Sequence, residues 1–333
     1  MYVREENMQM EVRTLARTGA TKARYVWLMI LAATVILFGG TAYGQQNVSS
    51  QSGQQNLSSQ QNLSGQQDLS EISKELTNPV SNVWSMFTEF DLFFSDGNIK
   101  NTGGSKVGGR MIFQPVLPIP LYGQERGQWK LITRPTIPEI FSQPIPRGFN
   151  DFTNLGGLGD TQLPLLVSPP TGNWLLGLGP TLLLPTATRT EFGRQQVGAG
   201  PALIVGYKAK DWIGGVFPQY TWRVAGWNGK DKPDASYLSI LYFFAYSLPD
   251  AWQVGFNPTI NYDARATSGN RWNVPVGLFV SKTTKVGKMP VKYVLSIEYS
   301  VASQYAFGQR AQVKLSIVPV IPSLVKKAIF GGS

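Results

Sequence analysis

The side chains that most enzymes use for catalysis are missing from this chain of 333 residues, which contains no histidine and no cysteine. Histidine is the commonest general base and a frequent metal ligand, so most hydrolase and metal-site chemistry is excluded. Glu89 and Asp91 stand where a strand would place both carboxylates on one face, an arrangement that could serve as a catalytic dyad. An ordinary solvated or salt-bridged pair explains the same spacing without catalysis. We therefore expect no enzyme activity and no cofactor or metal.

Charged and polar side chains recur at every second position in several segments. Residues 309–318 are the clearest case, because Gln312 and Lys314 alternate there with the apolar Val313 and Leu315. A period of two indicates a strand with one polar and one apolar face. If the polar faces enclose a lumen, its predicted lining is Arg110, Gln114, Lys130, Arg134, Arg223, Lys292, Glu298, Arg310 and Lys314. The excess of basic residues could favour anions, or the charges could pair and close the interior.

Tryptophan residues mark the ends of these segments. Four of them follow a short polar turn and share the parity of the apolar side chains, as Trp174 does with Leu176 and Leu178. An aromatic ring at the end of an apolar face is typical of the lipid–water interface. The apolar faces are therefore predicted to contact lipid. The predicted interface girdle consists of Trp129, Trp174, Trp212 and Trp252 at one end, with Trp222 and Trp272 at the other.

The elements that carry these faces predict an all-β fold. About 12 strands of roughly 10 residues each are expected, the length that a tilted strand needs to cross a bilayer. They lie near 84–94, 109–117, 129–137, 159–167, 174–184, 196–206, 212–222, 236–247, 252–262, 271–281, 290–301 and 309–318. Short turns alternate with longer loops such as 138–158, as in a transmembrane antiparallel up-and-down β-barrel with both termini in the periplasm. A β-propeller and a soluble β-sandwich are the alternatives.

The N-terminus carries an export signal. Basic residues, the apolar run 26–38 and the small residues Ala42 and Gly44 predict a signal peptide over residues 1–44. An uncleaved inner-membrane anchor fits the same pattern. Export favours the outer membrane of a Gram-negative bacterium, with membrane lipid, the assembly machinery and a small-molecule solute as partners. The net charge of +10 could also suit nucleic acid, but an exported chain makes that the weakest partner.

Three further segments complete the predicted organisation. A Gln/Asn/Ser-rich repeat predicts a disordered linker over residues 45–70. A short periplasmic helix is expected over 71–83, with Ser70 as its N-cap, at the periplasmic mouth or inside the lumen. The barrel is then predicted to span residues 84–322, and residues 323–333 form a C-terminal tail. The oligomeric state is not predicted.

Several motifs resemble those of a known family. The most specific is the run Gly177–Thr188. It is accompanied by Gln114–Pro118, Gly156–Asp160, Gly198–Ala202 and Ser268–Pro275. Over roughly residues 75–320 the chain resembles bacterial transporter-like proteins often labelled "neuromedin U", related to the outer-membrane family named for the meta-pathway of phenol degradation. The resemblance implies an outer-membrane barrel that passes small molecules, including hydrophobic ones.

Three functional hypotheses follow for the lumen. The first is a transporter for small molecules, including hydrophobic or aromatic compounds, with a lateral exit where Gly177 and Gly179 leave few inward side chains. The second is a diffusion pore for anionic solutes, lined by arginine and lysine. The third is a plugged structural barrel, in which the inward charges pair with one another.

Overall fold

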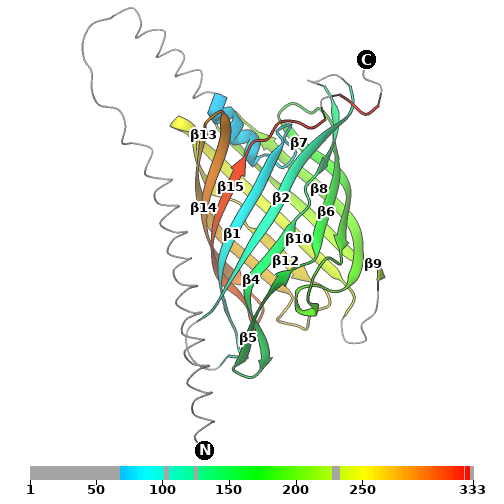
Figure 1. The fold of residues 1–333 in the computed structure, drawn as a ribbon, viewed down its shortest axis with the longest axis vertical. Helices are drawn as coiled ribbons and strands as arrows, with labels where there is room; N and C mark the ends of the chain where they lie inside the picture. Colours follow the sequence, from blue (N-terminus) through cyan, green and yellow to red (C-terminus); the bar gives the residue numbers. More distant parts are fainter. Residues whose placement is uncertain (1–67, 101–104, 124–126, 227–232, 326, 331–333) are drawn as a thin grey trace, which may run out of the picture. The chain divides into compact units, whose positions relative to one another are not determined.

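The computed structural model describes residues 68–100, 105–123, 127–226, 233–325 and 327–330, which all belong to one compact unit. The predicted signal peptide, the alternative anchor and nearly all of the predicted linker lie outside the described residues. Within the described ranges, no helix is both long and apolar enough to cross a membrane. The fold consists mainly of strands, which Figure 1 shows wound around a common axis.

Fifteen strand segments form one antiparallel sheet that closes on itself. β1 pairs on one side with β15 and on the other with β2, which completes the ring. The segments are β1 (Ser85–Asp96), β2 (Lys106–Tyr122), β3 (Trp129–Thr133), β4 (Ile137–Gly148), β5 (Asp151–Leu158), β6 (Thr161–Ser168), β7 (Trp174–Leu184), β8 (Gln196–Lys208), β9 (Trp212–Gly226), β10 (Ser236–Leu248), β11 (Trp252–Phe256), β12 (Thr259–Asp263), β13 (Trp272–Val286), β14 (Met289–Ala302) and β15 (Gly308–Pro319).

Interruptions divide three of the strands into two segments each. β3 continues into β4, β5 into β6 and β11 into β12, so the closed barrel has 12 strands and the predicted fold is confirmed. Two of the interruptions contain a proline, Pro135 and Pro258. Proline lacks the N–H that a ladder hydrogen bond needs, so the strand divides there without leaving the barrel.

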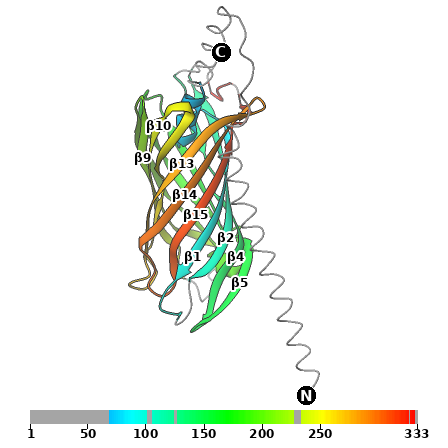
Figure 2. The ribbon, with the colours of Figure 1, turned by 90° about the vertical axis from the view of Figure 1, so that its left-hand side faces the viewer.

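The loop expected over residues 138–158 is instead a β-hairpin, so that detail of the prediction was wrong. β4 and β5 pair along most of their length, and Figure 2 shows the hairpin at the barrel end opposite the helix over residues 68–77 (blue). Pro144 and Pro146, which favoured a loop, are tolerated because β4 has left its other neighbour, β2, after Ser142.

The two faces of the barrel wall differ in polarity as the alternation predicted. Leu278 is 71% exposed on the outside, whereas Glu298 and Lys292 are 3% exposed on the inside. A soluble sandwich or barrel would bury the apolar face of each strand, so the exposed apolar face excludes a soluble β fold. An apolar outer band on a closed antiparallel barrel is the architecture of outer-membrane proteins.

Aromatic rings gather at the barrel end where the first predicted girdle lies. The strands β3, β7, β9 and β11 begin with Trp129, Trp174, Trp212 and Trp252. Ring centroids there lie 5.2 Å apart for Trp174 and Tyr207, and 5.8 Å apart for Tyr207 and Trp212. Trp222 and Trp272 are about half exposed, near the end of β9 and at the start of β13. These positions fit two girdles, and contact of the rings with lipid stays a prediction.

A helix over residues 68–77 (blue in Figure 1) lies beside the turn between β8 and β9 that precedes Trp212, since Glu75 contacts Lys208 and Lys74 contacts Lys210 there. Residues 68–70 are already helical, so Ser70 is not the N-cap that the sequence predicted. The helix ends before Pro79, because proline cannot continue the helical hydrogen bonding. We call residues 68–84 the plug segment, since they enter the barrel ahead of β1.

Candidate transport pathway through the barrel

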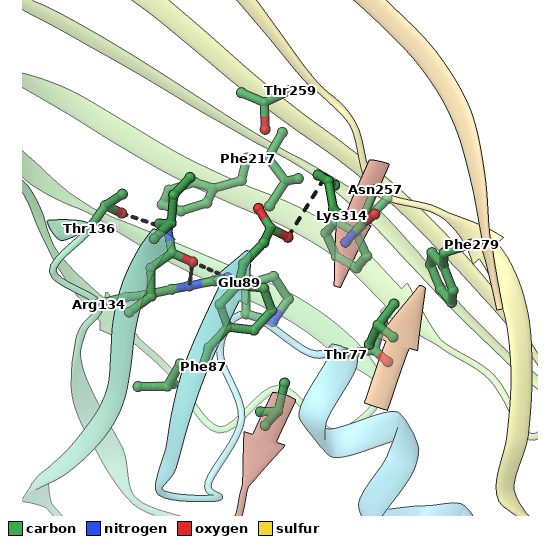
Figure 3. A pocket seen from close by; sticks show the side chains of 18 of the residues that line it. Thr77, Phe87, Glu89, Arg134, Thr136, Phe217, Asn257, Thr259, Phe279 and Lys314 are labelled. Atoms are coloured by element: carbon green, nitrogen blue, oxygen red, sulfur yellow. Dashed lines mark hydrogen bonds and ion pairs between the residues drawn. The ribbon is translucent and has the colours of Figure 1, made fainter. Parts of the chain in front are cut away.

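A cavity of about 370 Å³ lies between the plug segment and the inner wall of the barrel (Figure 3). A second cavity of about 350 Å³ is lined by residues further from the plug segment. Gln162, Ser239 and Asn261 line both cavities, so the two follow one another along the lumen. We treat the first as the central cavity and the two together as the candidate pathway.

One side of the lumen carries a chain of charges, which we call the charged arc. It consists of Glu89, Asp91, Arg110, Glu298, Gln312 and Lys314, on β1, β2, β14 and β15. Lys314 Nζ lies 2.6 Å from Glu298, and Arg110 Nε lies 2.7 Å from Asp91. Gln312 joins the two pairs, donating to Glu298 and accepting from Arg110. Both cations of the arc thus have carboxylate partners, as charges removed from water require, although three carboxylates face two cations.

The other side of the lumen is apolar, and we call it the apolar arc. It consists of Leu175, Ala202, Ile204, Ile213, Phe217, Leu241, Phe243 and Ala245, on β7 to β10. Phe217 and Phe243 are each 4% exposed and border the central cavity. Burying a side chain of this size stabilises a fold by about 2 kcal/mol. The arc therefore strengthens the wall and offers an apolar surface to an occupant of the cavity.

Gly177 shows how the plug segment meets the apolar arc. A Cβ atom at Gly177 would lie 3.3 Å from Val80 Cγ1 and 3.6 Å from Leu166 Cβ. The space left by the missing side chain is thus filled by Val80 rather than open, which corrects the expectation for this glycine. At Gly179 a Cβ atom would lie 1.9 Å from the Leu165 carbonyl oxygen, because the two strands approach closely there.

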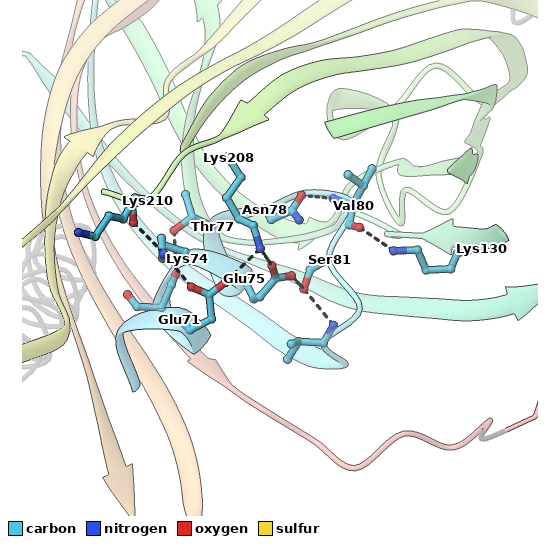
Figure 4. Close-up of polar contacts among 12 residues, drawn as sticks. Glu71, Lys74, Glu75, Thr77, Asn78, Val80, Ser81, Lys130, Lys208 and Lys210 are labelled. Atoms are coloured by element: carbon cyan, nitrogen blue, oxygen red, sulfur yellow. Dashed lines mark hydrogen bonds and ion pairs between the residues drawn. The ribbon is translucent and has the colours of Figure 1, made fainter. Parts of the chain in front are cut away.

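Residues at the end of the wall hold the plug segment through partly exposed polar contacts (Figure 4). Lys208 Nζ lies 2.6 Å from Glu75 and 3.1 Å from Glu71. Lys74 of the plug segment in turn donates to the Lys210 carbonyl oxygen at 2.8 Å. Ion pairs at a surface contribute about 1 kcal/mol or less each, so this set of contacts is a weak latch.

A buried lysine binds the other side of the plug helix. Lys292 Nζ donates to the Ser73 carbonyl oxygen at 3.1 Å, to Gln253 Oε1 at 2.6 Å and to Thr77 Oγ1. A cation close to carbonyl groups in the last turns of a helix is favourable, because the helix dipole is negative there. Among the described residues, Lys292 has no carboxylate within ion-pair distance. Docking of the plug segment therefore supplies partners that this buried charge needs.

The pKa of Glu71, which lies outside the membrane-spanning strands, shows how the lysines of the latch act on the plug helix. Burial alone would raise the pKa of its carboxyl, but hydrogen bonds and charge from Lys74 and Lys208 outweigh burial and hold that pKa below its ordinary value. A lowered pKa means that the docked helix favours the ionised form of Glu71. Protonation by acid therefore weakens the latch.

The wall between β6 and β9 contains prolines at strand positions. The ladder between β6 and β7 passes over Leu165 and Leu166 without pairing them. Pro180 faces Pro201 across β7 and β8, and neither residue has an N–H to donate. The ladder therefore lacks bonds at these positions, although β7 and β8 stay paired over ten consecutive residues.

Six of the nine predicted lining residues border the central cavity. They are Arg110, Gln114, Arg134, Lys292, Glu298 and Lys314. Lys130 instead donates to the Val80 carbonyl oxygen of the plug segment at 3.3 Å. Arg223 pairs with Asp234 at 2.8 Å near the end of β9, and Arg310 does not line the cavity. Contact of the six with a solute stays a prediction.

Aromatic side chains in the cavity lining were not predicted. Phe87 and Phe217 line the cavity and share the inward parity of their polar neighbours Glu89 and Gln219. The sequence reasoning assigned apolar residues to the lipid face, because most of them follow that parity. Tracing the parity from each polar residue to its second neighbour would have identified these two phenylalanines.

No protein-family model and no curated protein matches the sequence. Among solved structures, an outer membrane channel from Pseudomonas putida F1 has a TM-score of 0.50 at 12% identity, covering 72% of this chain and 96% of that chain. A monoaromatic hydrocarbon channel, CymD, has a TM-score of 0.34 at 10% identity, covering 76% and 92%. A BenF-like porin from Pseudomonas fluorescens Pf-5 has a TM-score of 0.32 at 10% identity, covering 72% and 99%.

At these identities the first likeness supports the barrel fold alone, and the lower scores of the other two carry no argument. The barrel that the resemblance to "neuromedin U"-labelled proteins implied is confirmed by the closed sheet. Membership of that family stays a prediction.

Proposed function

We propose that the protein is an outer-membrane channel that carries small, largely apolar molecules, including aromatic compounds. The observation that carries the proposal is the central cavity, where apolar and aromatic side chains face charges that, apart from Arg134, are held by partners. Sites for small organic molecules are typically concave, mostly apolar and provided with a few polar groups that fix orientation. The cavity combines these properties inside a closed barrel, on the line between the two sides of the membrane.

An anion-selective diffusion pore has less support. Arg110 and Lys314 are paired with carboxylates, and Lys292 is bound to the plug segment. Selectivity for anions needs basic side chains whose field reaches the solute, and paired charges leave little of that field. The docked plug segment also occupies one end of the path that hydrated ions would use.

The docked plug segment is the observation that favours the third hypothesis, a structural barrel. A channel requires that the plug segment shift or leave, whereas a structural barrel keeps it in place. The interrupted ladder between β6 and β7 is the feature of the wall that favours a lateral route for an apolar solute. A lateral exit there would differ from the one expected from the sequence, because Val80 fills the space beside Gly177 and would have to move.

Two measurements on the full chain separate the three hypotheses. Planar-bilayer recording of purified protein gives ion conductance and selectivity, and uptake of 1-naphthol by cells with and without the protein gives passage of an apolar aromatic solute. Protein-dependent uptake with little ion current supports the proposal. Large anion-selective conductance without faster uptake would support the diffusion pore, and neither activity would support a structural barrel.

A further inference from the structure

Arg134 differs from the other cations that line the central cavity. Arg110 and Lys314 have carboxylate partners, and Lys292 is held by the plug helix and Gln253. Arg134 has no carboxylate within ion-pair distance among the described residues. Its Nε and Nη2 atoms both donate to Gln114 Oε1, at 3.2 and 2.7 Å. A neutral amide oxygen orients the guanidinium but does not neutralise its charge.

Glu89 is the acidic side chain whose charge acts on Arg134, but its hydrogen bond and its ion pair are made to other residues. Glu89 accepts a hydrogen bond from Ser316 at 3.1 Å and faces Lys314 Nζ at 3.8 Å. Figure 3 shows Glu89 directed toward Lys314, with Arg134 and Thr136 grouped on one side of the cavity. Glu89 therefore acts on Arg134 only through space, so an anion in the cavity would find N–H donors at Arg134 that no carboxylate occupies.

The guanidinium is held in a fixed orientation. Its carbon lies 5.4 Å from the centroid of the Phe87 ring, and Gln114 Nε2 donates to Thr136 Oγ1 at 2.7 Å. Among the described residues no acceptor binds Arg134 Nη1 or the Thr136 hydroxyl hydrogen. These N–H and O–H donors lie close together, on a scaffold that is already ordered. A carboxylate accepts hydrogen bonds from a guanidinium in a planar, two-point geometry, so the arrangement suits that group.

The rest of the cavity suits an apolar body. Phe217, Leu241 and Phe243 of the apolar arc line it, together with Phe279 of β13. The geometry points to a binding site for one small amphipathic acid, with its carboxylate on Arg134 and Thr136 and its apolar body against the apolar arc. This inference rests on the proposed function and narrows the solute class from apolar molecules in general to monocarboxylic acids with an apolar body.

The charge of the site selects among the possible head groups. One unpaired guanidinium balances the single charge of a carboxylate, whereas a phosphate monoester would bring nearly two negative charges beside Glu89. An ammonium group would meet a cation instead of a partner. The cavity volume of about 370 Å³ falls within the range of pockets for small organic ligands.

The test compares two probes that differ only in charge, 3-phenylpropionate and 3-phenylpropionamide. Binding to the full chain in lipid nanodiscs is measured by equilibrium dialysis at neutral pH, with empty nanodiscs as the blank. Hydrogen bonds to a charged group are stronger than those to a neutral one, so the acid is expected to bind about tenfold more tightly or better. Arg134→Gln is expected to remove the preference for the acid and to leave binding of the amide unchanged. Arg134→Lys is expected to keep part of the preference for the acid.

A matched control is Arg147→Gln, on β4, which changes an arginine on the continuation of the same strand but outside the cavity. It leaves the preference unchanged. Equal binding of acid and amide by the wild type, or a preference that survives Arg134→Gln, overturns the carboxylate site and leaves the proposed function standing. If neither probe binds the wild type, the cavity does not take apolar solutes and both ideas fail. Unfolding of each variant in urea verifies that the comparison is made on folded protein.

Discussion

The charged arc and the apolar arc face the same lumen, but they stabilise the barrel in different ways. The charged arc depends on partners: Lys314 Nζ reaches Glu298 at 2.6 Å, and either side chain alone would be an uncompensated charge. The apolar arc depends on contact area: Ile204 and Ile213 are fully buried without any polar partner. Removing one side chain of the charged arc therefore leaves a buried charge without its partner. Removing atoms from the apolar arc lowers the free energy of unfolding in proportion to the contact area lost.

The plug segment makes apolar contacts with one arc and polar contacts with a strand of the other. Val80 packs against the apolar arc at Gly177, whereas Lys292, on a strand of the charged arc, holds the helix through polar contacts. Arg134 lies between the arcs, at the break between β3 and β4, and belongs to neither. The difference between the arcs suggests that apolar contacts position the plug segment and a solute in the lumen. The paired charges instead hold the strands of the charged arc together.

The largest effect is expected from locking the plug segment to the apolar arc. The chain has no cysteine, so Val80→Cys with Gly177→Cys introduces one disulfide, and a Cβ at Gly177 would lie only 3.3 Å from Val80 Cγ1. Oxidised protein should lose 1-naphthol uptake completely, and a reductant should restore it. Each single cysteine variant is the control. Undiminished uptake by the oxidised double variant would show that the plug segment need not move.

Lys314→Met should break the charged arc. Glu298 and Glu89 would stay buried without their cation, and removing one partner of a buried pair costs about 3–5 kcal/mol. The free energy of unfolding in urea, followed by tryptophan fluorescence in detergent, measures this loss. Glu298→Gln added to Lys314→Met should recover part of it. Arg223→Gln, at an exposed pair, is the control and should cost about 1 kcal/mol or less.

Phe243→Ala should weaken the apolar arc by a smaller amount. Truncating a buried phenylalanine to alanine lowers the free energy of unfolding by about 3 kcal/mol or more. The smaller value is expected here, because the Phe243 ring already borders a cavity. Phe244→Ala, on the outer face of the same strand, is the matched control, since its ring stacks on Trp212 at 5.9 Å outside the lumen. Equal losses at the two positions in the same urea experiment would contradict the distinction between inner and outer packing.

The smallest effect concerns the latch at Glu71. Its carboxyl has a pKa below the ordinary value of 4.5, so the stabilisation of the docked helix is fully present above that value and is lost as the pH falls through the lowered pKa. A fluorophore on the plug helix should report release in this acidic range, at a higher pH for Lys208→Met than for the wild type. Release with the same midpoint in Glu71→Gln would assign the transition to another group.

Local periodicity explains why much of the fold could be predicted. Alternation placed Lys314 inside and Leu278 outside, because successive side chains of any strand point to opposite faces. The count of 12 strands follows from the same local pattern, as does the position of four tryptophans at strand starts, whereas their role as a girdle stays a prediction. The hairpin at β4 and β5 was missed because proline marks both loops and strand edges, and only the surrounding sheet decides between them.

The sequence by itself determined the inward face of most polar side chains, since parity depends only on backbone geometry, but it missed the inward Phe87 and Phe217. It could not determine their partners, because Lys292 and Ser73 are 219 residues apart in the chain and meet only when β14 and the plug segment are in place. Tertiary structure alone decided that Arg110 has a carboxylate and that Arg134 has none. Register between distant strands sets such pairings, and it depends on closure of the whole barrel rather than on any one segment.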